Sequence, residues 1–161
     1  MKNVTQGITV VIVSYYSLDI IQGCLTSISE YTREYKGEVE IIIVDNANDD
    51  KFESNILRLI GSLNLTVRLI NSSLNLGYGG GNNLGLNAAS FDIVCIMNPD
   101  VRLIEPLFND VAGIFQCNED LCLVGCKQVS KKSRAIHIRP EYSIPLFKPV
   151  LSFLCNYFID L

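Results

Sequence analysis

The segment Ile8-Thr9-Val10-Val11-Ile12-Val13-Ser14 is a run of mostly β-branched, apolar side chains that ends in a serine. Such a continuous run is typical of a strand covered on both faces, as in a parallel sheet. The residues that follow carry an apolar stripe at spacings of three, four and three: Leu18, Ile21, Leu25 and Ile28. This spacing indicates one face of a helix. The segment therefore predicts a buried strand followed by a helix that packs on it.

The same alternation continues along the chain. Further strand-like runs lie at 39–44, 66–70 and 91–97. Helical stripes lie at 52–63, through Leu84 and Ala88, and at 107–115, and the run Leu121 to Cys126 is a candidate fifth strand. Strands that alternate with helices predict an α/β fold with three layers, a mostly parallel sheet and right-handed crossovers.

Length and composition restrict the class of protein. The chain has 161 residues, 48% of them hydrophobic, and a formal net charge of -4, so it can bury a core and shows no basic face for nucleic acid. It is short for an enzyme with two substrates, and we expect one α/β domain that is incomplete at its C-terminal end. Residues 1–130 are predicted to form the ligand-binding core, and residues 131–161 an apolar tail or the start of a further region.

The six cysteines occur without any C-x-x-C pair, and several lie in apolar runs, so reduced buried thiols are favoured over disulfides or zinc. The start of the chain, Met1 to Gly7, is polar and lacks the pattern of a signal peptide, which predicts a cytoplasmic protein. The tail, Ile144 to Leu161, is apolar but interrupted, and falls short of the roughly 20 apolar residues that a membrane span needs. It is a candidate contact with a membrane surface or a partner chain.

Polar residues follow each predicted strand. They are Ser14-Tyr15-Tyr16, Asp45-Asn46, the stretch Asn71 to Asn83, and Asn98-Pro99-Asp100. In open parallel sheets, ligands bind beyond the carboxyl ends of the strands. We therefore expect these four segments to meet around one ligand.

Two of these segments favour a nucleotide. Asp45 ends a strand, where its carboxylate can accept a hydrogen bond from a base N–H; the alternative is that Asp45, Asn48 or Asp49 caps the next helix. In the stretch 71–83, Gly79, Gly80 and Gly81 permit positive φ and the approach of a ligand to the backbone, and the helix that they introduce would offer N–H groups to anionic oxygens. The alternative is an ordinary flexible turn. Neither a P-loop nor a dinucleotide fingerprint occurs after the first strand.

Asn98-Pro99-Asp100 is the candidate metal site. Mg²⁺ and Mn²⁺ prefer oxygen ligands, commonly one or two carboxylates together with substrate phosphates, and Asp100 offers a carboxylate. The alternative is a plain turn after a strand. The single histidine, His137, is interpreted as a surface residue, and the basic residues between 131 and 139 as a solvated loop.

Taken together, four ordered blocks resemble family 2 of the glycosyltransferases with the GT-A fold, and within it the rhamnosyltransferase-like members. The blocks are Val10 to Tyr15, Glu40 to Ala47, Asn75 to Asn83, and Met97 to Val101. The resemblance covers about residues 8 to 130. It implies a UDP- or dTDP-sugar as donor and an inverting transfer to a saccharide or lipid-linked acceptor, in polysaccharide or cell-envelope biosynthesis.

The resemblance also implies roles for individual residues. Ser14 and Tyr15 would lie near the nucleotide, Asp45 would bind a uracil or thymine ring, and Asp100 would hold Mg²⁺ or Mn²⁺. The remaining residues expected to bind the nucleotide sugar are Asn75, Gly77, Gly80, Gly81, Asn82 and Asn98. Asn98 stands where many relatives have a second carboxylate, and Tyr16 stands where the family often has Asn.

No residue of the chain matches the general base of the family, whose members continue for about another hundred residues. Glu105, Glu119, Asp120 and Glu141 lack a matching context. Two interpretations of the glycosyltransferase therefore stay open: a fragment of an active enzyme, or a donor-binding module that works with a partner chain. A nucleotidyltransferase-like protein is a third, disfavoured because the glycine-rich turn after the first strand is missing.

Overall fold

A computed structural model describes residues 7–49, 51–118 and 120–126, together with the backbone of 151–155. The strands of this part are β1 (Ile8–Ser14), β2 (Val39–Asp45), β3 (Thr66–Asn71), β4 (Ile93–Met97) and β5 (Leu151–Cys155). The helices are α1 (Leu18–Thr32), α2 (Phe52–Ile60), α3 (Gly77–Ala88) and α4 (Phe108–Cys117). All neighbouring strands pair in parallel, in the order β3-β2-β1-β4-β5. The predicted α/β fold is confirmed.

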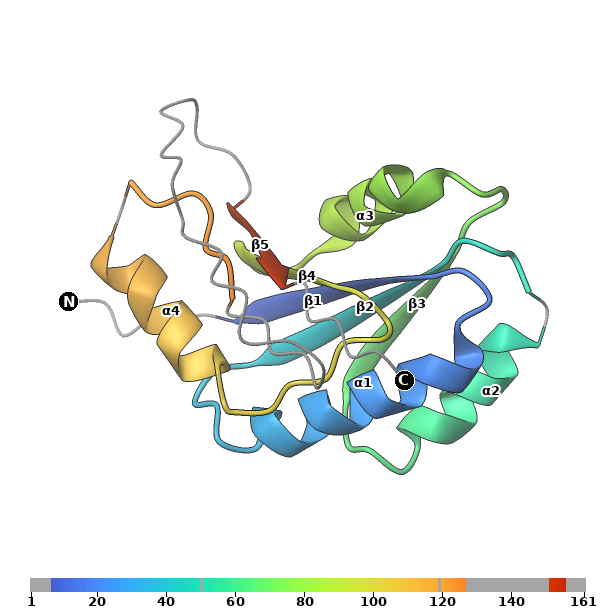
Figure 1. The fold of residues 1–161 in the computed structure, drawn as a ribbon, viewed down its shortest axis with the longest axis horizontal. Helices are drawn as coiled ribbons and strands as arrows, with labels where there is room; N and C mark the ends of the chain where they lie inside the picture. Colours follow the sequence, from blue (N-terminus) through green and yellow to red (C-terminus); the bar gives the residue numbers. More distant parts are fainter. Residues whose placement is uncertain (1–6, 50, 119, 127–150, 156–161) are drawn as a thin grey trace, which may run out of the picture.

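The sheet lies between two helical layers (Figure 1): α3 covers one face, and α1, α2 and α4 lie on the other. The alternation of side chains along β1 shows why. Ile8, Val10 and Ile12 belong to the larger core beneath α1, α2 and α4, whereas Val11 and Val13 belong to the smaller core that α3 covers. Because successive side chains of a strand point to opposite faces, a strand that is apolar throughout requires cover on both.

Two predicted elements differ from the structure. The helix that follows β3 begins at Gly77, well before Leu84, so it includes the glycines that were expected to form a loop. The strand predicted at Leu121 to Cys126 is wrong, since these residues show only an isolated bridge at Gly125. The segment that pairs with β4 is Leu151–Cys155. Both segments are apolar, and apolar pattern alone does not tell which one reaches the free edge of β4.

Strand β5 lies beyond the predicted division at residue 130, which stays a prediction. The rest of the apolar tail, His137 and the basic residues around it lie outside the described residues. Within the described part, no helix combines the length and the apolar character that crossing a membrane requires.

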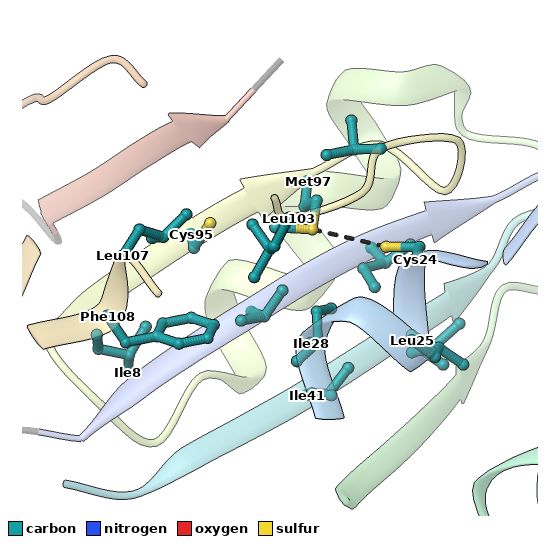
Figure 2. Close-up of a cluster of buried hydrophobic side chains, with 14 of the residues drawn as sticks. Ile8, Cys24, Leu25, Ile28, Ile41, Cys95, Met97, Leu103, Leu107 and Phe108 are labelled. Atoms are coloured by element: carbon teal, nitrogen blue, oxygen red, sulfur yellow. Dashed lines mark hydrogen bonds between the residues drawn. The ribbon is translucent and has the colours of Figure 1, made fainter. Parts of the chain in front are cut away.

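The larger core includes buried sulfur atoms (Figure 2). The Cys24 sulfur lies 3.6 Å from the Met97 sulfur and 3.7 Å from the Asn98 carbonyl oxygen. Burial, followed by the electrostatic influence of Cys95 and Asp100, raises the pKa of the Cys24 thiol far above its usual range. Cys24 therefore stays a protonated, structural thiol. The prediction of buried, reduced cysteines is confirmed for Cys24 and Cys95, whereas Cys117 is exposed.

Helix α3 packs closely on β1 because two of its residues lack side chains. A Cβ atom on Gly81 would lie 2.7 Å from Val13 Cγ1, and one on Gly85 would lie 2.3 Å from Val11 Cγ1. Valine is stiff at χ1, so it cannot easily move out of the way. These two glycines set the distance between α3 and the sheet.

We predict that Gly85→Ala destabilises the fold by about 1–2 kcal/mol, because overpacking against Val11 outweighs the gain in helix propensity. Gly113→Ala is the matched control, since a Cβ there, also in a helix, meets nothing within 4 Å. It should stabilise by about 0.5–1 kcal/mol. Urea unfolding measures both, and equal effects of the two substitutions would contradict the close packing.

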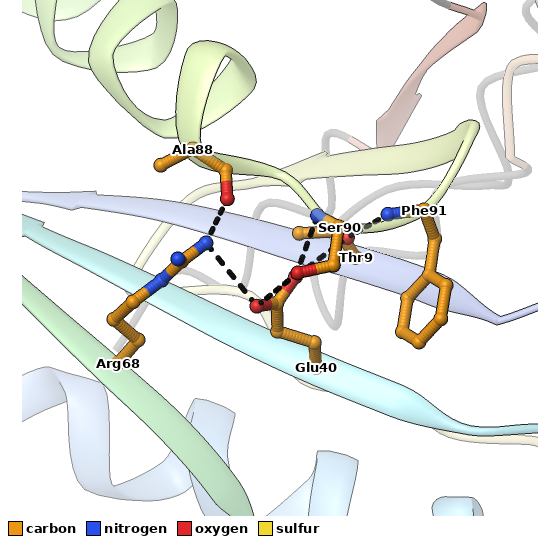
Figure 3. Close-up of polar contacts among 6 residues, drawn as sticks. All are labelled: Thr9, Glu40, Arg68, Ala88, Ser90 and Phe91. Atoms are coloured by element: carbon orange, nitrogen blue, oxygen red, sulfur yellow. Dashed lines mark hydrogen bonds and ion pairs between the residues drawn. The ribbon is translucent and has the colours of Figure 1, made fainter.

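Glu40 stabilises the end of the sheet where the strands begin (Figure 3). Its carboxylate accepts hydrogen bonds from the Thr9 hydroxyl (3.0 Å), the Ser90 backbone N–H (3.0 Å) and the Ser90 hydroxyl (2.9 Å). It also forms an ion pair with Arg68 at 3.2 Å, and Arg68 donates to the Ala88 carbonyl. This network joins β1, β2 and β3 to the end of α3.

Burial acts to raise the pKa of Glu40, but the bonds from Ser90 and Thr9 and the charge of Arg68 outweigh it, and the pKa falls below its ordinary value of 4.5. A carboxyl group with a lowered folded-state pKa contributes stability that is present above its unfolded pKa and lost as the pH falls through the folded one.

We therefore predict that Glu40→Gln flattens the loss of stability between about pH 5 and about pH 3. Glu38→Gln, at an exposed neighbouring position, is the control and should keep the slope of the unchanged chain. Unfolding free energies measured across this range test the prediction. The same slope in all three proteins would exclude the network as a source of acid sensitivity.

Candidate functional site

The carboxyl ends of β1, β2 and β4 lie at one edge of the sheet. Ser14 pairs with Asp45, and Asp45 pairs with Asn71. On the other side of β1, Ile12 pairs with Met97, so Asn98-Pro99-Asp100 emerges at the same edge. Neighbouring strands lie about 4.8 Å apart, which places the ends of β2 and β4 roughly 10 Å from each other across β1. The strand ends therefore lie at one edge of the sheet; their meeting around one ligand stays a prediction.

The connection from β1 to α1 has a fixed frame and an exposed middle. Ser14 is fully buried, and its hydroxyl oxygen lies 2.6 Å from that of Ser17. Between them, Tyr15 and Tyr16 are 54% and 69% exposed. Tyr15 is thus accessible to a ligand at this edge, whereas the Ser14 side chain serves the turn.

Asp45 has a structural role that the sequence reasoning placed second. It is 2% exposed, and its two carboxylate oxygens accept the backbone N–H groups of Ala47 (3.1 Å) and Asp49 (2.8 Å). Asp49 in turn accepts the N–H of Lys51 at 2.9 Å. The carboxylate therefore shapes the connection to α2. Its bonding to a base stays a prediction, which has to use the lone pairs that remain.

Asn46 was not among the predicted site residues, yet it holds the site together. Its amide nitrogen donates to Asn75 Oδ1 (2.8 Å) and to the Gly77 carbonyl (3.2 Å), and its Oδ1 accepts the Leu76 N–H (3.0 Å). It is 2% exposed. The sequence offers one signal: an amide that directly follows a buried strand needs partners for both its N–H groups and its oxygen. The sequence does not show which partners these are, because they lie 29 to 31 residues away.

The glycine-rich segment differs from the prediction. Among the described glycines only Gly77 has positive φ, at +69°. Gly79, Gly80 and Gly81 are helical, and Gly81 faces β1 rather than a ligand. Asn75 Oδ1 accepts the Gly77 N–H at 2.8 Å as well as the Asn46 amide, so Asn75 anchors the start of α3. The helix still points its N-terminus to the edge where the strands end, and helix N-termini favour anions.

Two buried oxygens in the described part of the chain have no hydrogen-bond partner: Asn82 Oδ1 and Asp100 Oδ1. Both side chains influence Tyr78. Burial raises the pKa of Tyr78, the Asp100 charge adds to this increase, and a hydrogen bond with Asn82 opposes it. A buried polar atom without a partner costs free energy, and a bound water, ion or ligand is one way to satisfy it. Tyr78 was missed by the sequence reasoning.

Asn98-Pro99-Asp100 forms a turn, as the plain interpretation expected, because the Val101 N–H donates to the Asn98 carbonyl at 3.2 Å. The turn presents Asp100 with one free buried oxygen, which fits a cation or a donor group. No group of three or more His, Cys, Asp or Glu side chains that could hold a metal occurs in the described residues. Asp100 therefore suits a cation that takes most of its ligands from elsewhere, such as a diphosphate.

Two hollows of the described surface lie away from these residues. One, of about 200 Å³, is lined by side chains that include Arg33, Leu63 and Asn64, and the other borders Glu38, Glu40 and Phe91. Both are at the end of the sheet where the strands begin. Neither hollow is lined by Asn82 or Asp100, the residues with unpartnered buried oxygens, so neither is a candidate ligand site.

Comparison with known families decides the class of protein. The family model described as "Glycosyl transferase family 2" matches residues 9–157. The chain belongs to glycosyl transferase family 2. Membership of this family argues against the nucleotidyltransferase-like alternative.

Solved structures show the GT-A fold of this family 2 chain. TarS from S. aureus shares 22% identity over 83% of this chain and 23% of its own, with a TM-score of 0.66. TarS 1-349 in complex with UDP shares 20% over 82% of this chain and 38% of its own, with a TM-score of 0.68. The mannosyltransferase PcManGT from Pyrobaculum calidifontis, in complex with GDP-Man and Mn²⁺, shares 22% over 74% and 35%, with a TM-score of 0.64.

The chain thus spans between about a quarter and two fifths of the length of these solved proteins. The comparison with curated proteins found no match.

We predict that Asn46→Ala loosens the start of α3 in this family 2 domain, because it removes the acceptor of the Leu76 N–H and the donor to the Asn75 oxygen and the Gly77 carbonyl. The fold should lose about 1–3 kcal/mol, and the amides of Leu76 and Gly77 should exchange hydrogen faster. Asn87→Ala, at an exposed position of α3, is the control. Unchanged exchange at Leu76 in Asn46→Ala would show that Asn46 does not hold this segment.

Proposed function

We propose that this domain binds a nucleoside-diphosphate sugar, a UDP- or dTDP-sugar, together with one Mg²⁺ or Mn²⁺. The sugar, a hexosyl or rhamnosyl group, is transferred with inversion to a saccharide or lipid-linked acceptor, in polysaccharide or cell-envelope biosynthesis. The proposed location is the cytoplasm, with a peripheral position at the inner face of the cell membrane as the alternative. Family membership and solved relatives with UDP or with GDP-Man and Mn²⁺ support the donor class.

The observation that carries this proposal is the contrast between the two ends of the sheet. At the end where the strands begin, the Glu40 carboxylate is saturated by hydrogen bonds and an ion pair. At the end where they finish, Asp100 and Asn82 each keep a buried oxygen without a partner. A native protein tolerates such atoms where a ligand satisfies them.

Asp100 is the residue that would hold the cation, with the diphosphate oxygens and water completing the shell. When bound, the cation offsets negative charge on the leaving diphosphate. The residues of the chain contribute position: Asn46 and Asn75 fix the start of α3, whose N-terminus lies at the same edge. Asn98 and Ser14 shape the adjoining turns.

Transfer also needs a group that removes the proton of the acceptor hydroxyl. Of the four carboxylates considered, Glu105 and Asp120 are exposed, away from any described network, and Glu119 and Glu141 lie outside the described residues. None is assigned as the base. This favours, as the second candidate, a domain that binds the donor but needs further residues, from a longer chain or a partner, for transfer.

Calorimetry with UDP, dTDP and GDP, each with and without Mn²⁺, tests the proposal. We predict tighter binding of UDP and dTDP than of GDP, and tighter binding with Mn²⁺ than without. Asp100→Ala should abolish the effect of Mn²⁺, because it removes the carboxylate proposed to hold the cation. Asp110→Ala, at an exposed position on α4, is the control and should keep the effect.

Equal binding of all three nucleotides would contradict the proposed base selectivity. Metal dependence that survives Asp100→Ala would instead show that Asn98-Pro99-Asp100 is only a turn.

A further inference from the structure

The two tyrosines after β1 sit between fixed points. The Ser14 carbonyl accepts the Asn46 N–H at 2.8 Å, and the Ser17 carbonyl accepts the N–H groups of Ile20 (3.1 Å) and Ile21 (3.0 Å) at the start of α1. The hydroxyl oxygens of Ser14 and Ser17 lie 2.6 Å apart. Only two residues span this short gap, so the backbone has to turn sharply and both rings project outward.

Tyr16 makes this turn with a backbone conformation that a bulky residue rarely adopts. Its φ is +49°, and the other described residues with positive φ, apart from glycine, are Asn48 and Asn64. Asparagine tolerates this region, whereas for a large side chain it is a real outlier. Tyr16 is 69% exposed, so burial of its ring does not offset the cost. Strain of this kind persists where the surrounding structure imposes it, often at ligand sites.

Among the described residues, the ring of Tyr16 has one aromatic partner. It meets the Tyr15 ring edge to face, with centroids 4.8 Å apart and planes at 69°. Tyr15 remains 54% exposed at the edge where the strands end. An aromatic ring offers a stacking surface to any nucleic acid base, and a ring that is already oriented loses less freedom when the ligand binds.

We propose that Tyr16 is a positioning residue that holds the Tyr15 ring in place to stack on the base of the donor nucleotide. This inference rests on the proposed function, and it assigns Tyr16 to the base rather than to the diphosphate or the cation. It predicts that the strained tyrosine improves nucleotide binding at the expense of stability.

Three variants separate these effects. Tyr16→Asn relieves the backbone and removes the ring, so the unfolding equilibrium constant should fall roughly fivefold, while the affinity for UDP and UMP should fall about threefold to tenfold. Tyr16→Phe keeps the ring and should bind both nucleotides within about twofold of the unchanged chain. Asn64→Gly changes the backbone at a distant positive-φ position and should leave nucleotide affinity unchanged.

The decisive readout is pyrophosphate with Mn²⁺, a ligand without a base. Tyr16→Asn should bind it as well as the unchanged chain does, since only stacking on the base is lost. Affinity for UMP that is unaffected by Tyr16→Asn, or an equal loss for UMP and pyrophosphate, would overturn the role of Tyr16 alone. Failure of the unchanged chain to bind UDP would overturn both this inference and the proposed function.

Discussion

The parallel pairing of β1 with β2 and with β4 is the constraint on which the rest of the structure depends. Parallel strands finish at the same edge, so segments far apart in the sequence are brought to within two strand spacings of each other. Helix α3 completes the arrangement because Gly81 and Gly85 let it lie close to β1. Asn46, at the end of β2, then ties the beginning of α3 to that edge. The register of the strands therefore brings Asp100, the end of β2 and the start of α3 to the same edge.

The two ends of the sheet use polar groups differently. The Glu40 carboxylate accepts hydrogen bonds from Thr9 and Ser90 and pairs with the charge of Arg68, so its oxygens all have partners. Satisfied polar groups of this kind stabilise a fold. At the opposite end the same kinds of atoms are left open, at Asp100 and Asn82, and aromatic rings are exposed at Tyr15, Tyr16 and Tyr78. We infer that the first end is built for stability and the second for a ligand.

The sequence predicted the first four strands and their parallel direction, because runs such as Ile8 to Val13 are apolar on both faces and such strands need two covering layers. It also predicted that Asp100 lies just beyond a strand end, because Pro99 stops the preceding strand. It did not predict the start of α3: glycines disfavour helices in isolation, and only the tight fit of Gly81 and Gly85 on β1 explains their presence there. The local role of Asp45 was predicted only as an alternative, because a carboxylate after a strand can bind either the next turn or a ligand. The role of Asn46 was missed, because its partner Leu76 lies 30 residues away and such a bond leaves no pattern in the sequence. The pairing of Leu151–Cys155 with β4, rather than of Leu121 to Cys126, is a choice made by tertiary structure.

The central claim is that one edge of the sheet binds a diphosphate through a cation. Amide resonances of the chain, recorded with UDP and a trace of Mn²⁺, test it most directly, because the paramagnetic ion broadens signals only near its binding site. The account predicts broadening at Asp100, Tyr78 and Asn82, with sharp signals at Glu40 and Ser90. Broadening centred on Glu40 and Ser90, or no broadening that requires UDP, would contradict it.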